Sequence, residues 1–212
     1  MTILVVGDEK NLQESQQKFG SGFRYQHVIS RVQVGEFLKD DVVVFDFQDQ
    51  DSTTGIYSQY QGVVFLNCAK HALTKTENTR AAFFGFCGLP TFLNREILEV
   101  CTDNEADLKI LKDVCQALKT EYAVVKNQVG LITPRVIGMI INEAFFAAEG
   151  NIASRQHIDL AMRLGTNYPF GPFEWCEKIG VKNVFELLDA VYQSTGDERY
   201  KVCGLLRSEA IG

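Results

Sequence analysis

The sequence predicts an α/β domain followed by an all-helical domain, and three observations support this division. Short apolar runs alternate with polar or helical segments over residues 1–125, which is typical of a mostly parallel sheet with helical connections. Beyond residue 125 the apolar residues follow helical spacing instead. Gly and Pro also stand there at positions where helices begin and end. We therefore expect domains at 1–125 and 126–212.

Apolar runs predict the strands of the first domain. The run 2–6 ends at Gly7, which indicates a buried strand followed by a tight turn. Further strands are expected over 23–29, 41–47, 62–66, 82–87, 96–101 and 121–125. Helices are expected over 9–18, 33–39 and 104–119, the last because its apolar residues fall on one face.

The second domain should consist of helices with recognisable ends. A long helix is expected over 131–149, with Pro134 in its first turn and Gly150 at its end. Ser154 is a good N-cap for a helix over 155–164, and Gly165 a good residue after its end. Further helices are expected over 173–179, 182–195 and 198–209, with Gly180 and Gly196 as stops.

Composition narrows the class of partner and compartment. The chain has 21 Lys and Arg against 27 Asp and Glu, a net charge of −6, which disfavours nucleic acid and anionic membranes. No apolar run reaches the ~20 residues of a membrane span, and no basic segment precedes the first apolar run. The six cysteines and three histidines show no metal-site spacing. We expect a cytoplasmic protein with cysteine thiols and no metal.

A string of motifs lies in residues 142–173. It reads N-E-A, E-G-N-I-A-S, I-D-L-A-M-R-L-G and P-F-G-P-F, and Ile179-Gly180 follows. In order and spacing this string resembles the C-terminal domain of the 3-hydroxyacyl-CoA dehydrogenase family. The resemblance extends more faintly into the first half. The segment Phe84-Gly85-Phe86-Cys87 and the later Leu98-Glu99-Val100 are similar to the family's G-x-H-F-F-N-P and L-V-E-V.

The resemblance implies a specific architecture. It predicts a Rossmann-like first domain, here shortened, and a helical domain of the 6-phosphogluconate/3-hydroxyacyl-CoA dehydrogenase C-terminal type. In that family the first domain binds NAD, and the helices form a dimer and close the acyl-CoA site. We accordingly expect a homodimer through the C-terminal helices, an acyl-CoA-type ligand, and a place in fatty-acid metabolism.

The family's NAD-binding loop is altered in this sequence. The glycines of G-x-G-x-x-G let the backbone approach the pyrophosphate. The matching positions are Gly7, Glu9 and Leu12, so Gly7 is the one glycine retained. A carboxylate ~4 Å from a phosphate costs about 4 kcal/mol at an effective dielectric constant near 20, or about a thousandfold in affinity. NAD is thus implied by resemblance, but we expect weak binding. Gly7 then serves as an ordinary strand-to-helix turn.

The catalytic pair of the family is also altered. A His and a Glu twelve residues apart form it, and those positions hold Cys87 and Glu99. A thiol titrates near pH 8.5, and a neighbouring carboxylate raises its pKa further, which makes Cys87 a poor base. Cys87 is then a buried apolar residue at the end of a strand. The alternative is a nucleophile that attacks a CoA thioester.

Two more positions bear on catalysis. Pro134 stands where the family has the Asn that holds the substrate oxygen, and its side chain has no donor. His71 lies near the family's loop serine, where it is either a substitute base acting with Glu99 or an exposed loop residue.

Three functions remain open. The first is a 3-hydroxyacyl-CoA dehydrogenase-like protein that is inactive or weakly active, because the NAD loop and the catalytic His and Asn positions are changed. The second is an active NAD-dependent (S)-3-hydroxyacyl-CoA (3-hydroxybutyryl-CoA) dehydrogenase, an oxidoreductase with a rearranged site. The third is a module that binds acyl-CoA or a nucleotide, or that pairs with a full-length dehydrogenase. We favour the first.

Overall fold

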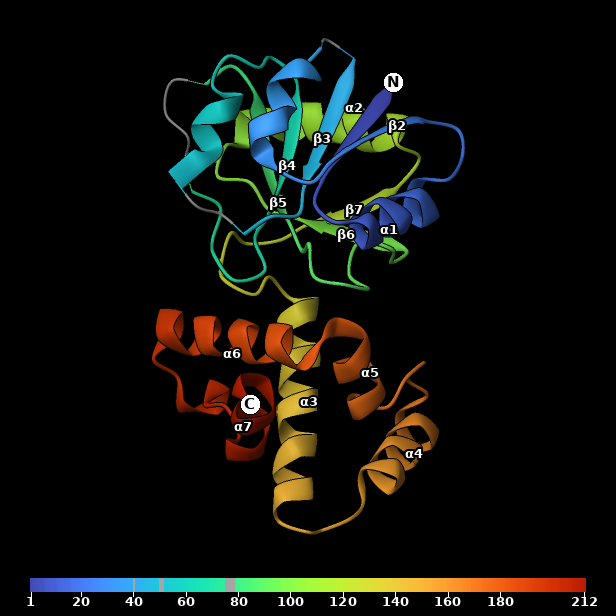
Figure 1. Cartoon of the computed structure of the whole chain (residues 1–212), viewed down its shortest axis with the longest axis vertical. Helices are drawn as coiled ribbons and strands as arrows, with labels where there is room; N and C mark the ends of the chain where they lie inside the picture. Colours follow the sequence, from blue (N-terminus) through green and yellow to red (C-terminus); the bar gives the residue numbers. More distant parts are fainter. Residues whose placement is uncertain (40, 50–51, 75–78) are drawn as a thin grey trace. The chain divides into compact units, whose positions relative to one another are not determined.

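The chain divides into two compact units, Met1–Leu131 and Ile132–Gly212. The computed structural model describes residues 1–39, 41–49, 52–74 and 79–212 (Figure 1). The division falls after Leu131, whereas the sequence placed it after residue 125. Each unit has its own secondary structure and is described separately.

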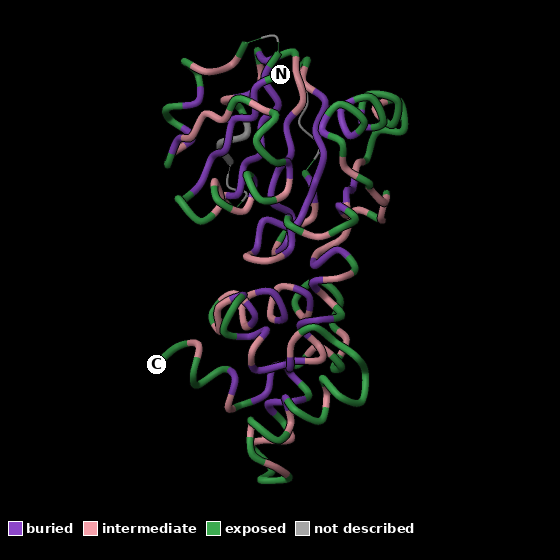
Figure 2. The backbone as a smooth tube through the Cα atoms, turned by 90° about the vertical axis from the view of Figure 1, so that its right-hand side faces the viewer, coloured by how far each residue is buried: buried purple, intermediate pink, exposed green. Residues whose placement is uncertain are grey.

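A five-stranded parallel sheet forms the centre of the first unit. Its strands run in the order β2-β1-β3-β4-β5. They are β1 Thr2–Val6, β2 Arg24–Val28, β3 Val42–Asp46, β4 Val63–Asn67 and β5 Ala82–Phe86. All residues of β1, β3 and β5 are buried, as expected for strands covered on both faces (Figure 2). The predicted α/β class and Rossmann-like topology are confirmed.

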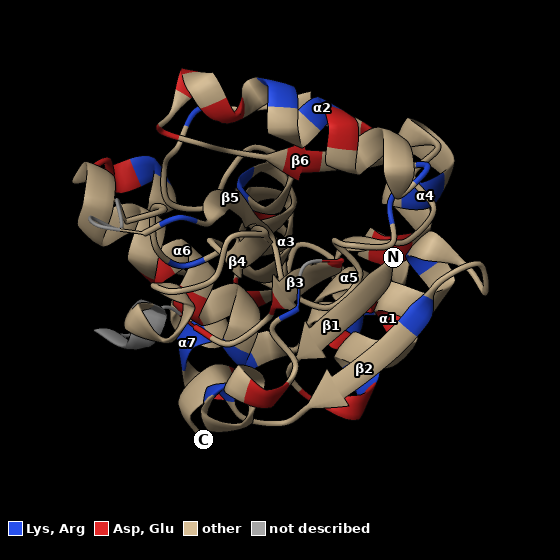
Figure 3. Ribbon diagram, turned by 90° about the horizontal axis from the view of Figure 1, so that it is seen from above, with Lys and Arg blue, Asp and Glu red and all other residues tan. Residues whose placement is uncertain are grey.

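Aromatic rings fill the face of this sheet that α1 (Glu9–Phe19) and α2 (Leu108–Ala117) cover. Phe45 lies at their centre, stacked on Phe65 with ring centroids 4.5 Å apart, and edge-on to Phe86 at 5.5 Å. Phe19 of α1 contacts the same ring at 5.0 Å. Charged residues lie along the outer surfaces of α1 and α2, while β1 and β3 carry almost none (Figure 3).

Short 3-10 helices stand in place of, or before, two of the helices that the sequence predicted for the first unit. The helix expected over 33–39 is the 3-10 helix η1 Arg31–Glu36, and the connection after β3 holds an unexpected one, η2 Ser52–Tyr57. The helix expected over 104–119 begins with η3 Glu105–Asp107 before α2. The last two strands, β6 Ile97–Val100 and β7 Glu121–Val124, form a separate parallel pair.

The second unit is a helical bundle, as predicted. Its helices are α3 Thr133–Glu149, α4 Arg155–Thr166, α5 Pro172–Ile179, α6 Val181–Thr195 and α7 Gly204–Ile211, with the 3-10 helix η4 Glu198–Tyr200. Ser154 caps α4 as expected. Two details of the prediction are wrong. Helix α4 runs through Gly165 to Thr166, and Asn167 after it has a left-handed φ of 56°. The segment 198–209 is η4 and α7 rather than one helix.

Within the described ranges, no helix is both long enough and apolar enough to cross a membrane.

Candidate functional site

Parallel sheets bind ligands at the carboxyl ends of their strands, and the resemblance places the cofactor there. The turn after β1 is the first part of this edge. Gly7 is buried, and its N–H donates to the carbonyl of Val28 at 3.0 Å. Asp8 caps α1 reciprocally with Asn11. The N–H of Asp8 donates to Asn11 Oδ1 at 2.8 Å, and the N–H of Asn11 to Asp8 Oδ1 at 2.9 Å.

This turn is poorly suited to a pyrophosphate. A methyl group on Gly7 would overlap Asn11 Oδ1, so the Asn11 side chain fills the space against the glycine. Two of the N–H groups that an anion would need at the helix N-terminus are already bonded. The exposed carboxylate of Glu9 lies in the first turn of α1, with Oε2 3.8 Å from His27 Nδ1. Hydrogen bonding and charge at this helix end therefore both oppose a diphosphate.

A buried ion pair that the sequence did not predict lies at the ends of β2 and β3. The Arg31 Nε donates to Asp46 Oδ2 at 2.6 Å, and the Tyr57 hydroxyl donates to the same oxygen at 2.9 Å. Burial raises the pKa of Asp46, and the hydrogen bond and charge of Arg31 oppose that shift. The Gln48 amide also donates to the carbonyl of Ile29 at 3.0 Å. The chain's own side chains thus fill this part of the carboxyl edge of the sheet.

Asn67 at the end of β4 has a structural role. Its Oδ1 accepts from the N–H groups of Ala69 and Gly88 at 3.1 and 2.9 Å. Its Nδ2 donates to the carbonyl of Phe47 at 3.1 Å. One side chain therefore joins the turns that follow β3, β4 and β5.

Cys87 and Glu99 lie in the same neighbourhood. Cys87 is buried one residue beyond β5, and Glu99 is half-buried on β6. Burial raises the pKa of the Cys87 thiol strongly, the charges of Glu99 and Glu14 raise it further, and Arg95 opposes them. The thiol therefore stays protonated at neutral pH, which suits neither a base nor a nucleophile.

Two further residues were predicted to bear on catalysis, His71 and Pro134. His71 is exposed in the loop that follows β4. Pro134 belongs to the second unit, buried in the first turn of α3 as predicted. Beside it, Arg135 Nη1 donates to the Tyr200 hydroxyl at 3.3 Å, with the guanidinium over that ring.

Motif residues of the helical unit form hydrogen bonds that join one helix to the start of another. Asn142 donates to the carbonyl of Lys201 at 3.0 Å and accepts from the N–H of Cys203 at 2.9 Å. Glu149 Oε1 accepts from the N–H of Leu205 at 2.8 Å, in the first turn of α7. These bonds fasten α3 to the segment that leads into α7.

Asp159 on α4 holds the start of α5 by hydrogen bonds of the same kind. Its two oxygens accept from the N–H groups of Phe173 and Glu174 at 2.8 and 3.3 Å. A side chain on Gly171 would overlap the Asp159 carboxylate, so this approach requires glycine. The I-D and G-P-F motifs therefore specify how α4 holds the start of α5.

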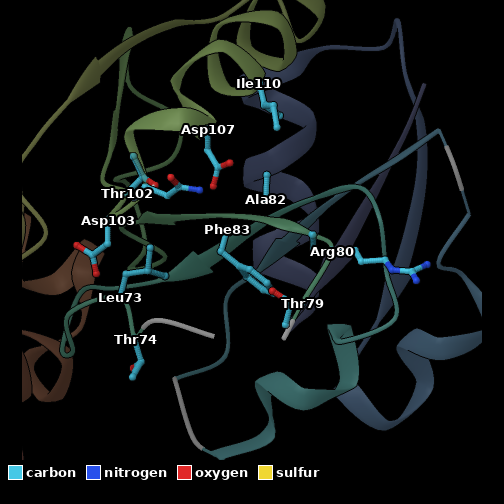
Figure 4. A pocket seen from close by; sticks show the side chains of 12 residues that line it. Leu73, Thr74, Thr79, Arg80, Ala82, Phe83, Thr102, Asp103, Asp107 and Ile110 are labelled. Atoms are coloured by element: carbon cyan, nitrogen blue, oxygen red, sulfur yellow. The ribbon is translucent and has the colours of Figure 1, made fainter. Parts of the chain in front are cut away.

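No group of three or more His, Cys, Asp or Glu capable of holding a metal occurs in the described part of the chain. A cavity of about 440 Å³ lies beside the amino end of β5, the opposite end of the sheet from the edge described above (Figure 4). No local pattern predicted this cavity, because its walls come from separate segments.

Comparison with known proteins identifies the helical unit. Residues 130–210 match the family model "3-hydroxyacyl-CoA dehydrogenase, C-terminal domain". The 3-hydroxyadipyl-CoA dehydrogenase of Escherichia coli K12 is 45% identical over 82 residues, 39% of this chain and 17% of that protein. The 3-hydroxybutyryl-CoA dehydrogenase of Clostridioides difficile is 34% identical over 82 residues, 39% of this chain and 29% of that protein.

The fold has solved counterparts over nearly the whole chain. The (S)-3-hydroxybutyryl-CoA dehydrogenase from Ralstonia eutropha aligns with a TM-score of 0.71 at 17% identity, covering 98% of this chain and 92% of that one. At that identity the likeness concerns the fold alone. The matched sequence spans less than a third of the two curated relatives named above.

Proposed function

Because residues 130–210 match the C-terminal domain of 3-hydroxyacyl-CoA dehydrogenases, we propose that the chain is a dehydrogenase-like protein without competent NAD-dependent activity. The observation that carries this proposal is the closed N-terminus of α1. There Asn11 fills the space against Gly7, and Glu9 adds a negative charge.

The chemistry at the family's base position supports the same proposal. Hydroxyl oxidation needs a group that takes a proton near neutral pH. Cys87 has a raised pKa and is buried, so it cannot take that proton from a substrate at pH 7. Pro134 offers no donor for the substrate oxygen. The motif residues Asn142, Glu149 and Asp159, in contrast, hold helices together through hydrogen bonds.

We expect no NADH oxidation with acetoacetyl-CoA, even at high protein concentration. The wild type should give the same background rate as Glu99→Gln, because a trace of host enzyme contributes equally to both preparations. Calorimetric titration with NADH should likewise show no binding up to millimolar concentration.

Turnover by the wild type that is lost in Glu99→Gln would contradict this proposal and support an active enzyme with a rearranged site. Cys87→Ser and His71→Ala would then identify the base, since only the variant that removes it should lose the remaining activity.

We further propose that the helical unit makes a homodimer through α3 and α4. Asp159 is the only buried residue among the described residues of α4, whereas Leu160 and Leu164 are 46% and 79% exposed. Val136 and Phe146 on α3 are also exposed. An amphipathic helix derives most of its stability from a covered apolar face, and a second copy supplies that cover with the same face.

Leu164→Glu should weaken this dimer. The substitution places a charge in the apolar contact, so we expect the dissociation constant to rise at least about a hundredfold, which is ~2.7 kcal/mol. Size-exclusion chromatography with light scattering measures the change. Gln193→Glu, an exposed position on α6, is the charge-matched control and should remain dimeric. A wild type that is monomeric at tens of micromolar would refute the proposal.

A further inference from the structure

Strand β5 is at the edge of the five-stranded sheet, and its hydrogen bonds reveal which residues face outward. The N–H of Ala82 donates to Gly62, and the carbonyl of Phe86 accepts from Cys68, so the even-numbered residues bond to β4. Backbone groups alternate between the two sides of a strand. The odd-numbered residues of β5 therefore direct their N–H and C=O groups away from β4.

That outer edge is paired at one point. Gly85 exchanges two hydrogen bonds with Cys101, at 2.8 and 2.9 Å, in an isolated antiparallel bridge. Two residues earlier, Phe83 faces the same side, yet its N–H and C=O have no hydrogen-bond partner among the described residues. The segment that follows Cys101 does not continue the pairing. Instead, the 440 Å³ cavity separates β5 from it (Figure 4).

The lining of this cavity is acidic and partly apolar. Asp103 and Asp107 lie on the wall opposite β5, and Leu73 and Ile110 add apolar surface. Arg80 extends away from the two carboxylates in Figure 4, so it does not neutralise them. A volume of about 440 Å³ falls within the usual range of about 300–1,000 Å³ for ligand sites.

We propose that this cavity receives an extended peptide segment of another protein, which carries lysine or arginine and adds a short strand to the edge of β5 at Phe83. The backbone groups of Phe83 supply the hydrogen bonds of strand addition, in which the main chain gives affinity and alternate side chains give specificity. The carboxylates of Asp103 and Asp107 select a basic side chain and repel phosphate-bearing ligands.

A fluorescein-labelled hexapeptide in which valine and lysine alternate is the probe. Fluorescence anisotropy should show saturable binding below 1 mM. Hydrogen exchange followed by NMR should show the amide of Phe83 protected at least about tenfold at saturation, with the Phe86 amide, already bonded within the sheet, unchanged. Lack of binding, or binding without protection of Phe83, overturns the proposal.

Matched peptides and variants test the backbone pairing and the selection for basic side chains separately. A peptide of the same sequence with alternate amides N-methylated keeps its charge and should bind at least about tenfold more weakly, as should a valine–glutamate peptide. Asp107→Asn should weaken binding about threefold, and Asp113→Asn on the outer surface of α2 should not. Equal binding of the N-methylated peptide refutes strand addition, and equal binding of the glutamate peptide refutes the selection for basic residues.

Discussion

Asp46→Asn is expected to destabilise the first unit by about 3–5 kcal/mol at neutral pH. Asp46 is fully buried, and its carboxylate accepts bonds from Arg31, Tyr57 and the N–H of Gln48. Asparagine removes the negative charge that the buried guanidinium of Arg31 faces at 2.6 Å. Urea unfolding followed by hydrogen exchange of the β3 amides measures the change.

Two further variants show whether the charge itself is responsible. Asp41→Asn, at a largely exposed carboxylate near the N-terminus, should change stability by less than about 0.5 kcal/mol. The double variant Arg31→Met with Asp46→Leu should be more stable than Asp46→Asn, because it leaves no buried charge. A cost below about 1 kcal/mol for Asp46→Asn would mean that Asp46 is protonated in the folded protein, since asparagine then replaces a neutral group of similar shape.

The strands of the first unit could be predicted because each is a local signal. An apolar run such as 2–6 or 62–66 identifies a buried strand from its own residues, and a polar or glycine boundary ends it. The helix ends at Gly150, Gly180 and Gly196 could be predicted for the same reason. Helix α4 was the exception. There the residue in the left-handed conformation is Asn167. Glycine is more common than asparagine at such a position, so the sequence favoured Gly165 as the helix end.

The Arg31, Asp46 and Tyr57 cluster could not be predicted because its members come from three separate segments. The parallel register of the sheet and the path of η2 bring them together, and neither follows from local pattern. A polar residue at the end of the buried run 42–45 was a usable signal, because a buried carboxylate needs a partner. The partner's identity required the fold. The cavity beside β5 was missed for the same reason.

The family resemblance and the changed site have a common explanation. In the second unit, Asn142, Glu149 and Asp159 each accept backbone N–H groups at or near the start of another segment. Substitution of such residues leaves backbone groups without these partners, two of them buried, so the helical fold depends on them whether or not the chain performs catalysis. The motif string therefore identifies the fold of the unit. The proposed loss of activity rests instead on positions in the first unit and on Pro134, where the sequence differs from the motifs it resembles.

Asn142→Ala tests this explanation and is expected to destabilise the second unit by about 2–5 kcal/mol. Asn142 is 3% exposed, and alanine removes a bond to the part-buried carbonyl of Lys201 and leaves the buried N–H of Cys203 unpaired, at about 1–3 kcal/mol for a buried group. Trp175, the only tryptophan, lies in α5, so its fluorescence reports unfolding of this unit alone. The exposed Gln193→Ala on α6 is the control and should change stability by less than about 0.5 kcal/mol. If Asn142→Ala unfolds at the wild-type urea concentration, these hydrogen bonds do not hold α3 to the segment before α7. The presence of Asn142 in the N-E-A motif would then be explained by a role in binding or catalysis rather than by stability.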